Sequence, residues 1–257
     1  MPSVLRANCS NEPLRLYSAL SEHDPTARVV PTHAGAPGVG SGGPHTLQIL
    51  TTEHWSLLAS RSMGYTEAMS RASIFVAALS GAVVSLALVA QATDFGDGFV
   101  AFALVLLPVV YFLGLTTVVR LAQINFEDAR WVQGMNRIRH AYLELAPELE
   151  PYFVTSRYDD RAGLLQSAVT RARPLAVPQQ FVSSPGVVAT LDSVVAGAAT
   201  GIAGLGLGLG MGGSLALGAV GLLVSIAGFA AWATRTIGVW TDQLDPLFPS
   251  PPELEDE

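Results

Sequence analysis

Residues 72–93 read ASIFVAALSGAVVSLALVAQAT, and residues 99–119 read FVAFALVLLPVVYFLGLTTVV. Neither stretch contains a charged residue, and each has about the 20 residues that a helix needs to cross the hydrocarbon core of a bilayer. Two further apolar runs, 187–209 and 214–234, form a second closely spaced pair. Because a helix of a soluble protein keeps a polar face, the runs predict an all-α polytopic membrane protein with four transmembrane helices in two antiparallel hairpins.

The composition agrees with this prediction. Half of the residues are hydrophobic, 14% are charged, and the mean hydropathy is +0.41. No catalytic, metal-binding or nucleotide-binding signature stands out, so we expect a protein that is not an enzyme and that carries no cofactor or metal. The lone cysteine, Cys9, cannot form an internal disulfide, which is typical of a chain whose soluble parts face a reducing cytoplasm.

The arginines predict the orientation in the membrane. All 14 basic residues are arginine, and the short connections 94–98 and 210–213 contain none of them. Basic residues near membrane segments remain on the cytoplasmic side. We therefore expect a multi-pass protein of the inner (plasma) membrane with both termini and the middle segment in the cytoplasm. The absence of lysine, with abundant Ala, Gly, Val and Leu, is typical of a GC-rich bacterial genome.

These observations divide the chain into six segments. They are a disordered N-terminal segment (1–45), a cytoplasmic helix leading into the membrane (46–71), the first transmembrane hairpin (72–119), a cytoplasmic helical region (120–186), a glycine-rich second transmembrane hairpin (187–235) and an acidic disordered tail (236–257).

Helical periodicity continues outside the first hairpin. After the second run, apolar residues recur at alternating spacings of three and four, with one polar member: Leu121, Ile124, Asp128, Trp131, Met135, Ile138, Tyr142 and Leu145. This coiled-coil-like seam predicts that the second membrane helix continues for about 25 residues without a break. Before the first run, the same spacing relates Trp55, Leu58, Ser62, Tyr65 and Met69. We expect the two seams to pack against each other. A further short helix is predicted over 160–171, capped by Asp159 or Asp160.

Glycines at intervals of four residues characterise the second hairpin. The candidates for helix packing are Gly197, Gly201, Gly204, Gly208, Gly212 and Gly218. Such glycines let helices approach closely in lipid. Three interpretations remain open at this point: packing within one chain, homo-oligomerisation through the glycine face, and a glycine-lined pore.

Few polar residues qualify as a site. Asp192 is the one acid near the interior of a membrane segment; it is either an interfacial or capping residue or a candidate for ion or proton binding. Pro108 should kink the second membrane helix. His54 beside Glu53, and His140 one turn before Glu144, lack the further ligands of a metal site.

The stretch WVQGMNRIRHAYLELAPELEPYFVTSRYDD (131–160) resembles a motif in uncharacterised four-span membrane proteins of GC-rich, actinobacterial-type bacteria. This resemblance implies no assigned activity and transfers no functional residue. In layout alone, the first half is similar to the two-transmembrane effector (SLATT-like) modules of bacterial nucleotide-signalling defence systems.

Together these features favour a non-enzymatic membrane scaffold or interaction module. Its expected partners are the lipid bilayer, further copies of the chain through the glycine-rich helices, and a cytoplasmic protein, with no nucleic acid. A pore-forming effector or small channel is the first alternative, and a small-solute transporter is the second.

Overall fold

The apolar runs form four long helices in a computed structural model that describes residues 43–168, 183–241 and 244–251. Helix α2 spans Pro44–Thr93, α3 spans Asp97–Leu145, α6 spans Ser184–Gly206 and α7 spans Gly210–Thr241. Each is long and apolar enough to cross a membrane. Two shorter elements, η1 (Pro147–Tyr152) and α4 (Arg161–Ala168), follow α3, and the described part of the chain contains no strand. The predicted all-α fold with four helices long and apolar enough to span a membrane is confirmed for the described residues.

Several predictions concern residues that lie outside the described ranges. These are the disorder expected for 1–42 and for 252–257, and the part of the helical middle region that covers 169–182.

Helices α2 and α3 are much longer than a membrane crossing. They contain 50 and 49 residues, or about 75 Å each at helical rise, against about 30 Å for the hydrocarbon core. The prediction that the second membrane helix continues beyond its apolar run is confirmed, because α3 is unbroken to Leu145. It also passes through Pro108 as one helix, and the kink there remains a prediction. Residues 44–71 of α2 and 120–145 of α3 are called the stalk below.

Tight turns join the helices of each pair. Asp94 and Phe95 follow α2 with φ values of 47° and 58°. Gly208, between α6 and α7, and Gly210, the first residue of α7, have φ values of 74° and 67°. Glycine accepts this left-handed conformation without steric cost. Gly208 therefore shapes a turn, and an added Cβ at Gly208 or Gly212 would meet no atom of this chain within 4 Å. Packing of these two glycines between copies of the chain stays a prediction.

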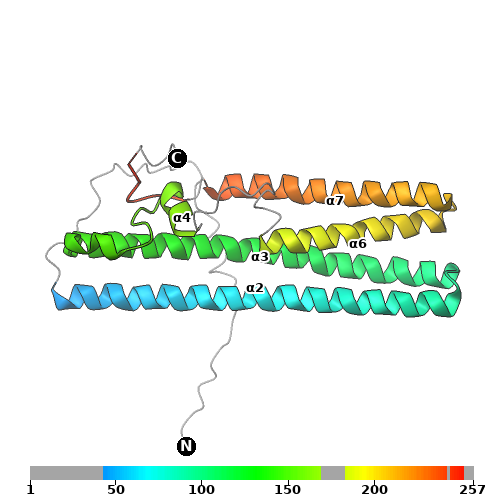
Figure 1. Cartoon of the computed structure of the whole chain (residues 1–257), viewed down its shortest axis with the longest axis horizontal. Helices are drawn as coiled ribbons and strands as arrows, with labels where there is room; N and C mark the ends of the chain where they lie inside the picture. The colour runs from blue at the N-terminus through cyan, green and yellow to red at the C-terminus, as the bar shows by residue number, and fades with distance from the viewer. Residues whose placement is uncertain (1–42, 169–182, 242–243, 252–257) are drawn as a thin grey trace, which may run out of the picture. The chain divides into compact units, whose positions relative to one another are not determined.

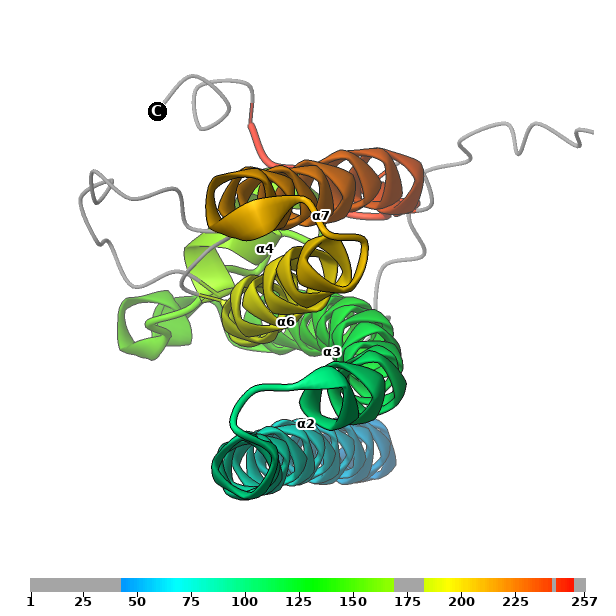
Figure 2. The ribbon, with the colours of Figure 1, turned by 90° about the vertical axis from the view of Figure 1, so that its right-hand side faces the viewer.

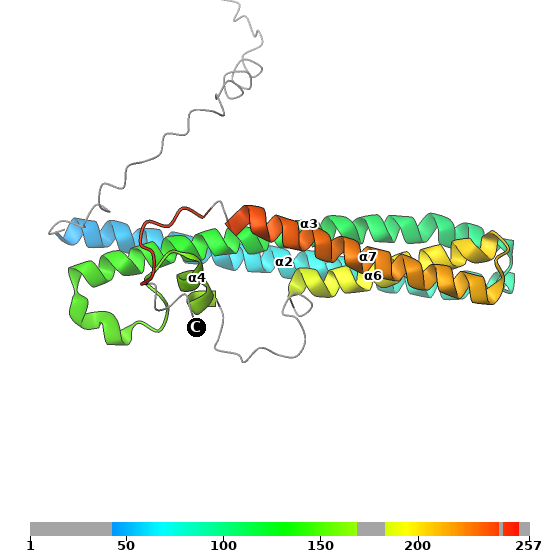
Figure 3. The same ribbon diagram turned by 90° about the horizontal axis from the view of Figure 1, so that it is seen from above.

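The four helices pack in a row. Helix α2 lies on α3, α3 lies on α6, and α6 lies on α7 (Figures 1 and 2). A continuous apolar cluster along this row includes Phe75, Leu121, Val188 and Val195. The short elements η1 and α4 pack on the stalk portion of α3 (Figure 3).

Candidate functional site

Ion pairs join the two helices of the stalk. Arg120 of α3 donates to both carboxylate oxygens of Glu67 at 3.0 Å, and Arg71 donates to the same group at 2.8 Å. The hydrogen bond from Arg120, followed by that from Arg71, lowers the pKa of Glu67 to about 2. Further along, Arg61 donates to Asp128 at 2.6 Å. Because water reaches these side chains, the pairs determine register more than stability.

Four of the eight residues in the predicted seam of α3 are buried, and the other four are half-buried. Leu121 and Met135 are 1% and 2% exposed, and Ile124 and Ile138 are buried as well. This face contacts α2 and, at its membrane end, the cluster around α6. For α3, the spacing of the apolar residues therefore identified the packing face correctly.

The predicted seam of α2 is wrong by one residue. Trp55 and Tyr65 are 65% and 67% exposed instead of packing on α3. The preceding position takes the contact, since a Cβ on Gly64 would come within 2.7 Å of the Trp131 ring. One residue turns a helix by about 100°, so the whole face is rotated. The physical reason is close packing, because Gly64 and Ala68 let the backbone of α2 approach α3 more closely than aromatic residues would.

The rotation leaves a row of four exposed side chains, followed by Met69, which is half-buried against the apolar cluster. We call Trp55, Leu58, Ser62, Tyr65 and Met69 the open seam. Four of them (Leu58, Ser62, Tyr65 and Met69) line one wall of a groove of about 390 Å³. Ile124 and Trp131 of α3 are on the other wall. The groove therefore runs along the stalk beside the ion pairs.

Two acids next to α4 hold the tail, which is defined here as residues 244–251. Asp159 accepts hydrogen bonds from the backbone N–H groups of Leu247 and Phe248 at 2.9 and 2.7 Å. Asp160 accepts one from the backbone N–H of Ser250 at 2.8 Å and a second, short one from its hydroxyl. Although burial raises the pKa of Asp160, its hydrogen bonds from Ser250 and from a backbone N–H at the start of α4 lower it overall.

Residues of α3 complete this contact. Arg137 donates to the carboxylate of Asp159 at 2.6 Å and to the backbone carbonyl of Asp245 at 2.7 Å. The rings of His140 and Phe248 stack at a centroid distance of 3.9 Å. The prediction of an acidic disordered tail over 236–257 is therefore wrong for the described residues of that segment. Helix α7 continues to Thr241, and the tail is bound through its backbone, which its own composition does not reveal.

Two histidines of the stalk, His54 and His140, do not form a metal site with other described residues. Burial, followed by the charge of Arg139, lowers the pKa of His54, and its ring lies 6.3 Å from that of Tyr142. His140 is 3.6 Å from Glu144, as the sequence spacing predicted. Among the described residues, no three His, Cys, Asp or Glu side chains are placed to hold a metal ion together.

Asp192 lies between helices and not at a helix end. The cap of α6 is Ser183, whose hydroxyl accepts from the backbone N–H of Gly186 at 3.3 Å, so the capping interpretation of Asp192 is wrong. The Asp192 side chain is fully buried, and neither carboxylate oxygen has a hydrogen-bond partner. It fills the space next to Gly114 of α3, where a Cβ would overlap the carboxylate and come within 2.8 Å of Phe75.

Small residues bring α6 and α7 together. A Cβ on Gly197 would lie 3.0 Å from the carbonyl oxygen of Gly218, and one on Gly204 would lie 3.1 Å from Ser214. Gly201 faces the same helix, with a Cβ position 3.4 Å from the carbonyl oxygen of Ser214. These four glycines of the predicted set thus contact the neighbouring helix of the same chain.

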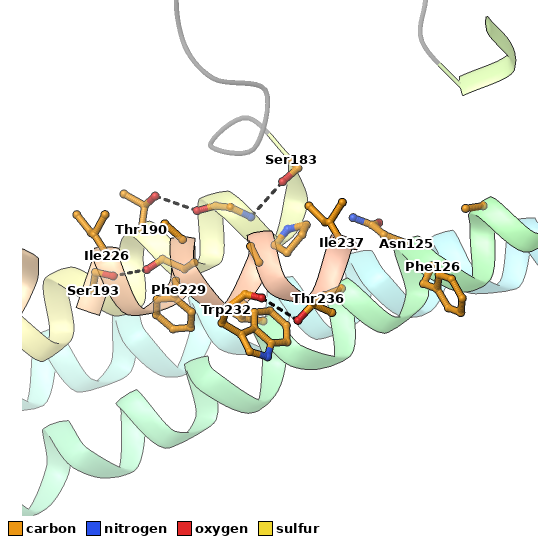
Figure 4. Close-up of a pocket in the computed structure, with 18 of the residues that line it drawn as sticks. Asn125, Phe126, Ser183, Thr190, Ser193, Ile226, Phe229, Trp232, Thr236 and Ile237 are labelled. Atoms are coloured by element: carbon orange, nitrogen blue, oxygen red, sulfur yellow. Dashed lines mark hydrogen bonds between the residues drawn. The ribbon is translucent and has the colours of Figure 1, made fainter. Parts of the chain in front are cut away.

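A cavity of about 880 Å³ opens between α3, α4, α6 and α7 (Figure 4). Its wall is mainly apolar and includes Phe229, Trp232 and Ile226. Thr190 and Thr236 also line it, but each hydroxyl donates to a carbonyl of its own helix at 2.8 Å. Asn125 and Arg161 also line the cavity, so a mainly apolar wall carries a few polar side chains.

Comparison of the chain with protein-family models, with curated proteins and with solved structures returned no match.

Proposed function

We propose that the chain is a non-enzymatic scaffold of the bacterial inner membrane that associates with further copies of itself through the stalk. Both termini and the middle segment are cytoplasmic in this proposal. The observation that carries it is the open seam. Its exposed tryptophan and tyrosine lie along a part of α2 that also bears Arg61 and Glu67, and charges of this kind place that part outside the hydrocarbon.

The spacing of the open seam suits a parallel helix pair. Copies in one membrane share their orientation, so their α2 helices run in the same direction. Trp55, Ser62 and Met69 then occupy one core position of the heptad, and Leu58 and Tyr65 occupy the other. In the heptad positions that flank this core, His54 of one helix lies opposite Ala59 of the other, and Arg61 lies opposite Thr66. No like charges therefore meet between the two α2 helices. Trp, Tyr and Met are also the residues enriched at protein interfaces.

The alternatives receive less support. A pore or a homo-oligomer built on the glycine face would need Gly197, Gly201 and Gly204, and these glycines contact α7 of the same chain. A transporter of a polar solute would need convergent polar groups, whereas the large cavity has a mainly apolar wall. We therefore place both alternatives second.

Disulfide crosslinking in native membranes tests this proposal. Cys9 is replaced by serine, and a single new cysteine is introduced as Ser62→Cys on the open seam or as Ser56→Cys, an exposed position about 120° away around α2. We expect crosslinked dimers with Ser62→Cys and few with Ser56→Cys. Equal crosslinking of both variants, or none at position 62, would refute association through this face.

A further inference from the structure

The contact between α3 and α6 joins the two helix pairs, because α2 packs mainly on α3 and α7 packs on α6. Asp192 lies within this contact, fully buried between Gly114 and Phe75. The adjacent Ser193 points to α7, where its hydroxyl lies 3.1 Å from that of Ser225. A carboxyl group is thus enclosed within the largest contact between the two helix pairs.

The surroundings of Asp192 offer no compensation for a negative charge. From α3 the nearest titratable side chain along the helix is Tyr111, one turn from Gly114, and it donates no hydrogen bond to the carboxylate. From α7 the neighbouring group is the Ser225 hydroxyl, which is already bonded to Ser193.

The nearest arginines along the two packed helices are also distant. Arg71 of α2 is four residues from Phe75, and Arg120 of α3 is six residues from Gly114, or roughly 6–9 Å at helical rise. Both arginines are paired with Glu67. Arg120 also pairs with Glu127 at 3.1 Å, so two acids balance the two arginines on the stalk side.

We propose that Asp192 is an intramembrane proton-binding site, in which the side chain carries its proton as a neutral carboxylic acid while α3 and α6 are in contact. An isolated buried carboxylate takes up a proton instead of remaining charged. A metal cation is the poorer occupant, because hard cations require several oxygen ligands and the described residues supply Asp192 with no polar partner.

The chemical step is a simple ionisation. Loss of one proton leaves one negative charge on Asp192, and that charge can be hydrated only if α3 and α6 separate there. Proton release and separation of the two helix pairs are therefore coupled. This coupling is independent of whether copies associate through the open seam.

Infrared difference spectroscopy of the whole protein in lipid vesicles tests the proposal. We expect the wild type at neutral pH to show the C=O stretching band of a protonated carboxyl, which shifts when aspartate is labelled with 13C at the side-chain carboxyl. The band should disappear in Asp192→Asn and remain in Asp97→Asn, which changes an exposed acid at the start of α3. Raising the pH should convert the band into a carboxylate band.

Two outcomes overturn the proposal. One is a labelled wild-type spectrum with no protonated aspartate at neutral pH, a result that does not depend on how any variant folds. The other is a band that persists in Asp192→Glu with its sensitivity to labelled aspartate unchanged, since the protonated group would then be another residue.

Discussion

The bound tail offers a quantitative prediction. In Asp159→Asn, the charged acceptor for the N–H groups of Leu247 and Phe248 and for Arg137 becomes a neutral amide. Hydrogen bonds to charged groups contribute about 1.5–3 kcal/mol each, and breaking a buried charge pair costs about 3–5 kcal/mol. Asn retains one acceptor oxygen, and Arg137 is partly exposed. We therefore expect tail binding to weaken by about 3 kcal/mol.

Amide hydrogen exchange measures this loss directly. A change of about 3 kcal/mol corresponds to roughly 100-fold faster exchange at Leu247 and Phe248, if the tail exchanges only when it is released. The control is Asp245→Asn, because Asp245 contacts Arg137 through its backbone carbonyl and not through its side chain. Unchanged exchange in Asp159→Asn, or equal acceleration in both variants, would refute the role that we assign to this carboxylate.

Two further predictions concern Asp160 and Gly114. The lowered pKa of Asp160 means that this carboxyl group holds fewer protons when the tail is bound than when the tail is free. Tail binding is therefore strong above pH about 4 and weakens as the pH falls below it. Energy transfer between labels on the tail and on α3 should decrease over that range, and a signal that is constant down to pH 2 would contradict the prediction. Gly114→Ala places a methyl group on the Asp192 carboxyl and should lower stability by about 1–3 kcal/mol in denaturation assays. Gly81→Ala, whose Cβ would meet no atom within 4 Å, should leave stability unchanged or raise it by up to about 1 kcal/mol through its helix propensity. Equal effects of the two variants would show that the α3–α6 contact is not tightly packed.

The sequence predicted the long helices well, because their signal is local. The four apolar runs and the unbroken seam in α3 can be interpreted from neighbouring residues alone. The face of α2 was misplaced because the pattern followed its large side chains, Trp55 and Tyr65. The contact with α3 is made instead by Gly64. The importance of its small size becomes clear only from its close approach to Trp131, which the sequence does not show.

Contacts distant in sequence explain the other differences. The hydrogen bond from Phe248 to Asp159 joins residues 89 positions apart, and nothing in the tail's composition indicates a receptor for its backbone. Asp192 was singled out from its position in an apolar run, but its burial depends on Gly114 and Phe75, which belong to two other helices. In both cases the sequence identifies the acidic residue, but the residues that surround it come from distant parts of the chain.

The mass of the intact complex in mild detergent tests the central claim, that the chain assembles with itself through the open seam. The wild-type complex should have the mass of two or more chains of 26.9 kDa each. Tyr65→Glu, which places a charge on the open seam, should shift the complex to a single chain, whereas Ser56→Glu on the other exposed face of α2 should retain the wild-type mass. A single chain in the wild type, or one mass shared by all three proteins, would contradict the account.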